Sequence, residues 1–174
     1  ETLAGPVSAE VEGRIVKVLM PKPRDLHLDI DLKSQQGWKS VDFVNTGVPH
    51  VVVHVEDILN HSVTEQGRAI RYHTRFSPEG TNANFMRAMG TDQLEIRTYE
   101  RGVEDETLAC GTGAIACALV GSIRGMVSSP VKVKTKGGED LIIHFRRKGD
   151  SFDEVWLQGN TSIVYQGKLH DEAL

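Results

Sequence analysis

The sequence predicts an α+β fold in which a mixed or largely antiparallel β-sheet curls around one buried central helix. Short segments rich in Val, Ile and Thr, set apart by many of the 17 glycines, are typical of strands. The segment 112–124 is apolar on nearly every side, which is typical of a helix buried inside a domain. Because strands outnumber helices and do not alternate with them regularly, a doubly wound sheet is not expected.

The expected strands share β-branched content and flanking turn residues. Several alternate apolar with polar side chains, as Leu26, Leu28, Ile30 and Leu32 do, which indicates sheets with one solvated face. The predicted strands cover residues 14–19, 26–32, 40–44, 50–55, 83–89, 93–100, 131–135, 140–146, 154–158 and 161–166.

Two segments have helical character. The first, 62–72, has Ser62 and Glu65 at the spacing of a capping box, and its low apolar content predicts a surface helix. The second, 112–124, places Ile115, Leu119 and Ile123 on one stripe, with small apolar residues around it. We therefore expect the second helix to form the centre of the core.

Composition and length exclude several classes of protein. A chain of 174 residues with 39% hydrophobic and 25% charged residues has the composition of a folded domain. Its net charge of -4 gives no basic surface for nucleic acid. No apolar run approaches the roughly 20 residues that cross a bilayer, and no secretory signal is recognisable. The sequence thus predicts a cytoplasmic protein with no nucleic-acid or membrane partner.

The two cysteines, Cys110 and Cys117, are expected to be free thiols. In one predicted helix their spacing separates the Cα atoms by roughly 10 Å, which is too far for a disulfide. The seven histidines are scattered, and no His, Cys or Asp spacing matches a zinc site, so no metal is expected.

Cys110 stands directly before Gly111-Thr112-Gly113, at the start of the buried helix. The free N–H groups and the positive dipole end of a helix are typical of an anion site, and glycines let a ligand approach the backbone. The same field lowers the pKa of a thiol, which predicts a reactive thiolate at Cys110. Cys117, farther along among alanines, is expected to pack in the core.

The residues around this cysteine read Glu100-Arg101-Gly102, then Glu106-Thr107, then Ala109-Cys110-Gly111-Thr112-Gly113. Together they resemble the second active-site motif of the diaminopimelate epimerase family. The resemblance extends over essentially the whole chain. Further matching segments are Gly5-Pro6-Val7, Thr46-Gly47-Val48-Pro49-His50 and Gly80-Thr81-Asn82-Ala83-Asn84-Phe85-Met86.

The resemblance implies an isomerase of lysine biosynthesis that converts LL- to meso-diaminopimelate without a cofactor, using two cysteines on opposite faces of the α-carbon. It implies that Cys110 is the second cysteine and that His50 and Glu100 assist catalysis. Asn84, Asp105 and Glu106 are expected to be turn or cap residues. The substrate ligands implied are Asn82, Glu100, Arg101 and the backbone N–H groups of Gly111 and Thr112.

Two departures from the family pattern bear on the extent of the domain. Val48 stands where the family usually has an asparagine, and the family's first cysteine motif has no counterpart in this chain. Residues 1–20 are therefore expected to be the end of an N-terminal lobe and residues 21–174 the C-terminal catalytic lobe, with a last strand that packs back toward the N-terminal lobe. The expected partners are the amino-acid substrate diaminopimelate and the missing lobe, with a homodimer as a further candidate. Alone, the chain is expected to be inactive.

Three alternatives remain open from the residues. Gly111 to Ala116 fits a Gly-x-Gly-x-x-Ala dinucleotide fingerprint, although residues 134–138 lack the acidic ribose ligand that should follow. Cys110 with His50 would also suit a thiol hydrolase. A catalytically silent lobe or binding module is the third alternative.

Overall fold

The computed structural model describes residues 5–32, 40–170 and 172. Among them, eleven strands form one mixed sheet with the neighbour order β1-β2-β11-β10-β9-β7-β6-β5-β4-β3, and β8 pairs with β7. Pairing is antiparallel except between β5 and β6 and between β7 and β9. The strands are β1 (Ala9–Glu12), β2 (Ile15–Leu19), β3 (Arg24–Ile30), β4 (Val41–Asn45), β5 (Pro49–His54), β6 (Asn82–Ala88), β7 (Gln93–Glu100), β8 (Asp105–Thr107), β9 (Val131–Lys134), β10 (Asp140–Lys148) and β11 (Ser151–Asn160).

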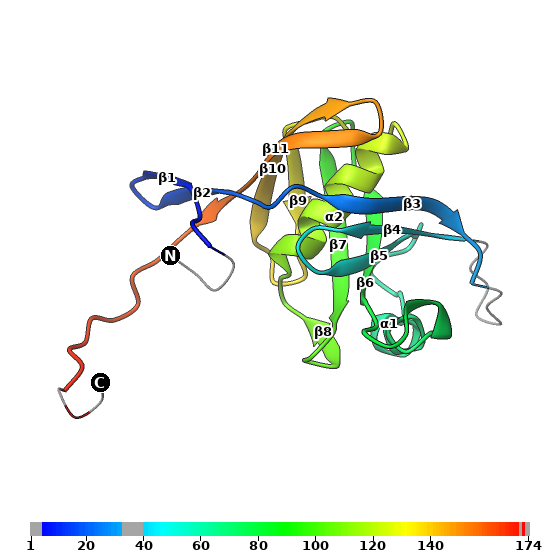
Figure 1. The fold of residues 1–174 in the computed structure, drawn as a ribbon, viewed down its shortest axis with the longest axis horizontal. Coiled ribbons are helices and arrows are strands. Elements are labelled where there is room, and N and C mark those ends of the chain that lie inside the picture. The colour runs from blue at the N-terminus through cyan, green and yellow to red at the C-terminus, as the bar shows by residue number, and fades with distance from the viewer. Residues whose placement is uncertain (1–4, 33–39, 171, 173–174) are drawn as a thin grey trace.

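The sheet curls around helix α2 (Gly111–Ile123), as Figure 1 shows. This helix contacts strands β4, β5, β6, β7, β9, β10 and β11, and residues 113–122 are all buried. Around it pack apolar side chains from these strands, among them Val52, Leu94 and Ile143. The predicted α+β fold with a buried central helix is therefore confirmed.

Helix α1 (Val63–Arg71) covers the other face of the central strands. Val63 and Ile70 pack there against Phe85 and Tyr99. The remaining side of α1 is exposed, as the sequence predicts for a surface helix. A short 3-10 helix, η1 (Thr74–Phe76), follows it.

The predicted capping box at the start of α1 is wrong. Ser62 is the N-cap residue, but its side chain makes no capping hydrogen bond. Its backbone, at φ -78° and ψ 68°, lies outside the extended conformation that lets an N-cap oxygen reach the first turn.

The predicted strand at 161–166 is also wrong. Strand β11 ends at Asn160, where its pairing with Ile15 of β2 ends, and Thr161 makes the last bond to the carbonyl of Arg14 at 2.7 Å. Beyond that point no described strand lies alongside to supply hydrogen bonds, so residues 161–170 are irregular and exposed. Two short strands, β1 and β8, were not predicted.

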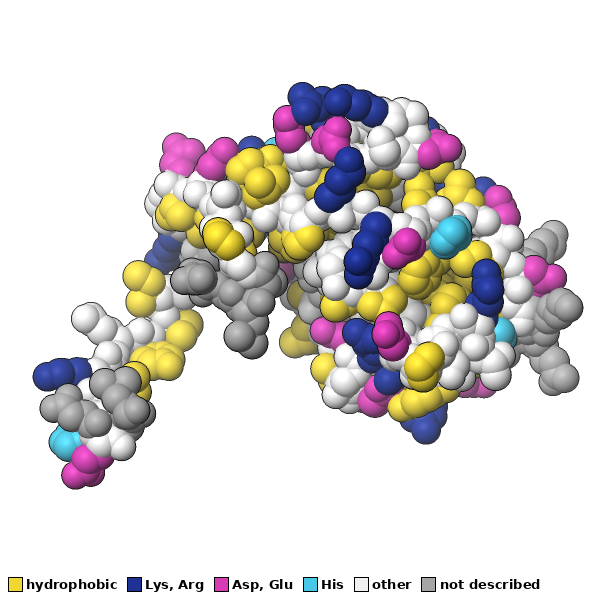
Figure 2. Space-filling model, in the orientation of Figure 1, with side chains coloured by type: hydrophobic (Ala, Val, Ile, Leu, Met, Phe, Trp, Pro, Cys, Tyr) yellow, Lys and Arg dark blue, Asp and Glu magenta, His cyan; other side chains and the backbone are white. Residues whose placement is uncertain are grey.

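The β1–β2 hairpin and the C-terminal segment project together from one side of the body (Figure 1). Hydrophobic side chains gather along both (Figure 2). The exposed hydrophobic residues there are Val7, Val11, Ile15, Leu19, Ile163, Val164, Tyr165 and Leu169.

The lobe boundary expected at residue 20 stays a prediction. Strand β2 pairs with β11 and so belongs to the same sheet as the rest of the chain, while residues 1–4 lie outside the described residues. Within the described part of the chain, no helix has the length and apolar character needed to traverse a membrane.

Candidate active site

Three neighbouring strands, β5, β6 and β7, carry polar side chains to the face that α2 covers. Successive side chains of a strand point to opposite faces, and Val52, Met86 and Ile96 of these strands pack in the core around α2. Residues at even spacing from these three share that face. They are His50 on β5, Asn82 and Asn84 on β6, and Thr98 and Glu100 on β7.

Cys110 lies where α2 begins. Its backbone is extended, with φ -136° and ψ 107°, and its carbonyl accepts the first helical hydrogen bond from the N–H of Ala114 at 2.9 Å. The sulfur lies 3.6 Å from the Oγ1 of Thr112. The carbonyl of Thr112 in turn accepts a hydrogen bond from the hydroxyl of Thr46 at 3.1 Å. Cys110 is thus the N-cap residue, and the helix begins at Gly111, one residue before the predicted start at Thr112.

The predicted lowering of the Cys110 pKa is wrong in direction. Burial raises the pKa of this thiol above its ordinary value, because the side chain is only 6% exposed. Hydrogen bonds from Thr112 and from the backbone N–H of Gly113 lower the pKa, while the negative charge of Glu100 raises it further. Burial therefore outweighs the helix terminus. Burial also raises the pKa of Cys117, which is packed inside α2 as predicted, and both thiols are free.

Two glycines let the start of α2 lie close to its neighbours. A Cβ atom at Gly113 would overlap the Oδ1 of Asn84 and lie 3.2 Å from the Cys110 sulfur. A Cβ atom at Gly111 would lie 2.9 Å from a methyl group of Leu157 on β11. The first turn of the helix therefore needs residues without side chains to sit against β6 and β11.

Asn82 ties the Glu100-Arg101 segment to the start of β5. Its Oδ1 accepts a hydrogen bond from the backbone N–H of Arg101 at 2.8 Å, and its Nδ2 donates to the carbonyl of Pro49 at 3.1 Å. The guanidinium of Arg101 donates to the carbonyl of Glu79 at 3.2 Å. Asn82 is thus a positioning residue for the backbone of Arg101, and substrate contacts by both side chains stay predictions.

His50 is completely buried on the α2 face. Its Nδ1 lies 3.1 Å from the Nδ2 of Asn84, whereas its Nε2 has no hydrogen-bond partner within the described part of the chain. Burial lowers the pKa of His50 to about 3, offset in part by the bond with Asn84 and assisted by the positive charge of Arg101. The imidazole is therefore neutral at physiological pH.

The structure places several of the residues that the family resemblance implied next to one another. Asn82 is the partner of His50 in the parallel register and bonds to Arg101, and Thr112 lies beside Cys110. Asn84, in contrast, is not the turn or cap residue expected from the sequence, because it lies inside β6. A polar residue at a core-facing position of an apolar strand is the signal that could have identified it.

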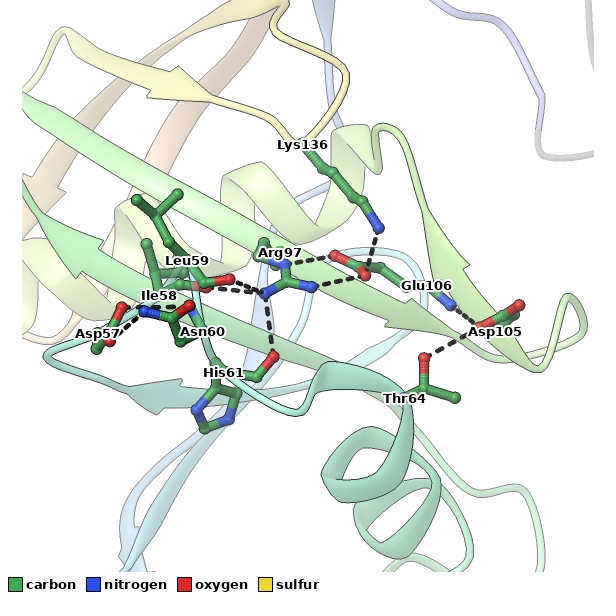
Figure 3. Close-up of polar contacts among 10 residues, drawn as sticks. All are labelled: Asp57, Ile58, Leu59, Asn60, His61, Thr64, Arg97, Asp105, Glu106 and Lys136. Atoms are coloured by element: carbon green, nitrogen blue, oxygen red, sulfur yellow. Dashed lines mark hydrogen bonds and ion pairs between the residues drawn. The ribbon is translucent and has the colours of Figure 1, made fainter.

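A second polar cluster lies on the opposite face of β7 (Figure 3). The guanidinium of Arg97 donates two hydrogen bonds to the carboxylate of Glu106 on β8, at 2.6 and 2.8 Å. The ammonium group of Lys136 approaches the same carboxylate at 2.5 Å. Burial raises the pKa of Glu106, but these two cations outweigh it and hold that pKa below its ordinary value.

This Arg97–Glu106–Lys136 cluster fixes the hairpin that joins the Glu100-Arg101 segment to Cys110. Neither Glu106 nor Asp105 is a turn or cap residue as predicted, because both lie in β8. The hairpin is also tied to α1 by a hydrogen bond from Thr64 to Asp105 at 3.1 Å. Arg97 extends the cluster to the preceding loop by donating to the carbonyls of Ile58, Leu59 and His61.

Comparison of the sequence with known proteins identifies one family and several of its members. The family model described as diaminopimelate epimerase matches residues 43–163. A diaminopimelate epimerase from Aquifex aeolicus (strain VF5) is 49% identical, over 100% of this chain and 62% of that protein. One from Hydrogenobaculum sp. (strain Y04AAS1) is 42% identical, over 99% of this chain and 62% of that protein. The chain thus spans about three fifths of the length of these curated relatives.

Solved structures share the fold at low sequence identity. A probable proline racemase from Agrobacterium radiobacter K84 superposes with a TM-score of 0.66 at 16% identity, over 88% of this chain and 54% of that chain. A hydroxyproline epimerase from Agrobacterium vitis gives the same TM-score and identity, over 88% of this chain and 52% of that chain. These similarities show a common fold.

Limited treatment with iodoacetamide is expected to label Cys110 before Cys117, because Cys117 is fully buried. Only the thiolate reacts, and burial raises the pKa of Cys110. Its labelling rate should therefore still rise with pH where an ordinary thiol has levelled off. Peptide mass spectrometry across about pH 7 to 10 measures this. Equal labelling of Cys117 would contradict the assignment.

Gly113→Ala is expected to lower the free energy of unfolding by about 1–3 kcal/mol, because the added methyl group overlaps Asn84. Gly90→Ala is the matched control, since a Cβ atom there lies 3.8 Å from its nearest neighbour, the Oδ1 of Asp92. Chemical denaturation of both variants measures the difference. Equal stability of the two variants would show that the start of α2 is not closely packed against β6.

Glu106→Gln is expected to lower the free energy of unfolding by about 1.5–3 kcal/mol, because it removes the charged acceptor shared by Arg97 and Lys136. The pKa of Glu106 is held below its ordinary value, so its charge stabilises the fold above the pKa of the unfolded carboxyl group, and this stabilisation is lost as pH falls through the folded-state pKa. The difference between variant and wild type should therefore shrink in acid. Glu154→Gln, in the exposed pair with Arg146, is the control and should change little.

Proposed function

The chain belongs to the diaminopimelate epimerase family, and we propose that it supplies one of the two catalytic cysteines of a cofactor-independent enzyme that inverts an α-carbon of diaminopimelate in lysine biosynthesis. The observation that carries this proposal is the position of Cys110 at the start of α2, where the charge of Glu100 acts on its thiol and Gly113 separates it from Asn84 of β6. Because the curated relatives are longer, the activity is proposed for a longer protein of which this chain is part.

Inversion of an α-carbon needs one base and one acid on opposite faces. In the proposed reaction a thiolate removes the α-proton, forming an S–H bond as the C–H bond breaks and leaving a carbanion. A thiol on the other face then delivers its proton to the same carbon and becomes a thiolate. The protons balance, and the two sulfurs have exchanged roles. Cys110 serves one face of the substrate.

The burial of Cys110 suits this chemistry. An α-proton of an amino acid is very weakly acidic, so a thiolate with a raised pKa is a better match as base than an ordinary thiolate. The backbone N–H groups of Gly111 and Thr112 at the helix terminus would hold the reacting carboxylate and stabilise charge as the carbanion develops. Glu100 would hold the reacting amino group, and Arg101 the distal carboxylate.

The second face must be served by another part of the longer protein. Cys117 cannot do so, because it is fully buried in the same helix as Cys110. The exposed hydrophobic side chains of the β1–β2 hairpin and the C-terminal segment offer a surface for that additional lobe. Apolar area of this kind on a soluble domain marks an interaction site, so self-association of the isolated chain is expected.

Family membership favours this function over the alternatives that the residues left open. A thiol hydrolase would need His50 to act as base on Cys110, but burial lowers the pKa of His50 to about 3, which makes it a weak base. A dinucleotide enzyme would use Gly111 to Ala116 for a pyrophosphate, yet the family whose model matches this segment is that of an epimerase.

The 174-residue chain alone is expected to leave LL-diaminopimelate unchanged, whereas the complete gene product converts it to the meso isomer. In the complete gene product, Cys110→Ala is expected to abolish inversion, because one face then lacks its acid or base. Cys117→Ala is the matched control and should retain activity, since this side chain is packed among alanines. Chiral chromatography of the two isomers measures conversion. Inversion by the lone chain would refute the requirement for a second lobe, and inversion by Cys110→Ala would refute the role of this thiol.

A further inference from the structure

Asn84 makes two hydrogen bonds that fix the orientation of its amide. One amide atom lies 2.8 Å from the carbonyl oxygen of Val51, which can only accept, so this atom is the nitrogen Nδ2. The other, Oδ1, accepts a hydrogen bond from the hydroxyl of Thr98 at 3.0 Å. Because these two partners lie on different strands, β5 and β7, the amide is held from both sides.

The fixed amide determines the tautomer of His50. The second hydrogen of Nδ2 points to the Nδ1 of His50, at 3.1 Å, and this contact requires a lone pair on Nδ1. A neutral imidazole without a proton on Nδ1 carries it on Nε2. The Nε2–H group is therefore a donor, and it is the buried atom that has no partner among the described residues.

We propose that Asn84 and Thr98 are positioning residues that lock His50 in the Nε2–H tautomer, so that His50 is a fixed hydrogen-bond donor to an anionic acceptor and not a proton carrier. The side chain of Asn84 adjoins the first turn of α2, because only glycine fits at position 113 between Asn84 and Cys110. The positive charge of Arg101 acts on His50 and favours an anion in this region. The role of the donor in catalysis rests on the proposed function, whereas the tautomer does not.

Nitrogen NMR of the 174-residue chain tests the tautomer without any activity. Long-range ¹H–¹⁵N correlation spectra are expected to show Nδ1 of His50 as an unprotonated ring nitrogen and Nε2 as a protonated one. A proton on Nδ1, or one averaged shift for both nitrogens, would overturn the proposal.

Thr98→Val removes the hydroxyl that holds the Asn84 amide and keeps the shape of the side chain. It leaves the Oδ1 of Asn84 without its donor, so that the amide is held only through Val51; the variant is expected to weaken the preference of His50 for the Nε2–H tautomer and, in the complete gene product, to lower kcat for diaminopimelate about 10-fold or more with a smaller change in KM. Thr98→Ser keeps the hydroxyl and should restore both measurements. Thr135→Val is the matched control, because Thr135 is buried to 4% exposure against 3% for Thr98 but lies beyond β9. Equal effects of the two valine variants, or no rescue by serine, would overturn the positioning role.

The source of the anionic acceptor is identified by the sample in which the ¹⁵N chemical shift of Nε2 changes. If the acceptor is a carboxylate of the substrate, the shift changes on adding diaminopimelate to the complete gene product. If it is an anionic group of the additional lobe, the shift already differs between that product and the 174-residue chain. An Nε2 shift that is the same in all three samples would overturn the donor role, and absence of turnover with the expected tautomer would refute only the proposed function.

Discussion

The register of β5, β6 and β7 is the constraint on which the site depends. Side chains alternate faces with a period of two, so a slip of one residue would move His50, Asn84 and Thr98 into the core around α1. Large apolar side chains prevent this. Phe85 and Val53 fill the core around α1, while their neighbours Met86 and Val52 pack around α2. The two hydrophobic cores thus specify where the polar residues lie, and the polar side chains form hydrogen bonds to one another and to the neighbouring backbone.

Burial then sets the chemistry of those residues more strongly than the helix terminus does. A favourable charge at a helix end is worth about 0.3–1 kcal/mol at an exposed site, whereas complete burial can shift a pKa by several units, each worth about 1.4 kcal/mol. Cys110 lies at the helix start but is nearly buried, so its pKa rises. His50 follows the same rule, since burial lowers the pKa of a group whose charged form is the protonated one.

The sequence predicted correctly those features of the fold that depend on residues close together in the chain. The buried helix α2, most strands and the thiol at the helix start follow from hydrophobic periodicity and from Gly111 and Gly113. The short strand β8, in contrast, is held by ion pairs of Glu106 with Arg97 on β7 and with Lys136, 30 residues further along the chain, which the local sequence does not indicate. The strand predicted at 161–166 is absent for the opposite reason. Apolar residues in the sequence favour a strand, but a strand forms only where another strand supplies hydrogen bonds. The predicted lowering of the Cys110 pKa was wrong because burial depends on packing at the start of α2, where Asn84 and Leu157, which are distant in sequence, lie against Gly113 and Gly111.

Strand β7 connects the two polar clusters of the molecule. Thr98 and Glu100 point toward α2, while Arg97 and Tyr99 point toward α1, where Arg97 binds Glu106 and the hydroxyl of Tyr99 donates to Glu104 at 3.3 Å. The residues that hold the hairpin before Cys110 are therefore not the residues that face the reacting groups. Because the two sets alternate along one strand, both depend on the position of β7. The residue that supports the hairpin, Arg97, and the residue that orients the amide beside His50, Thr98, are thus neighbours on strand β7.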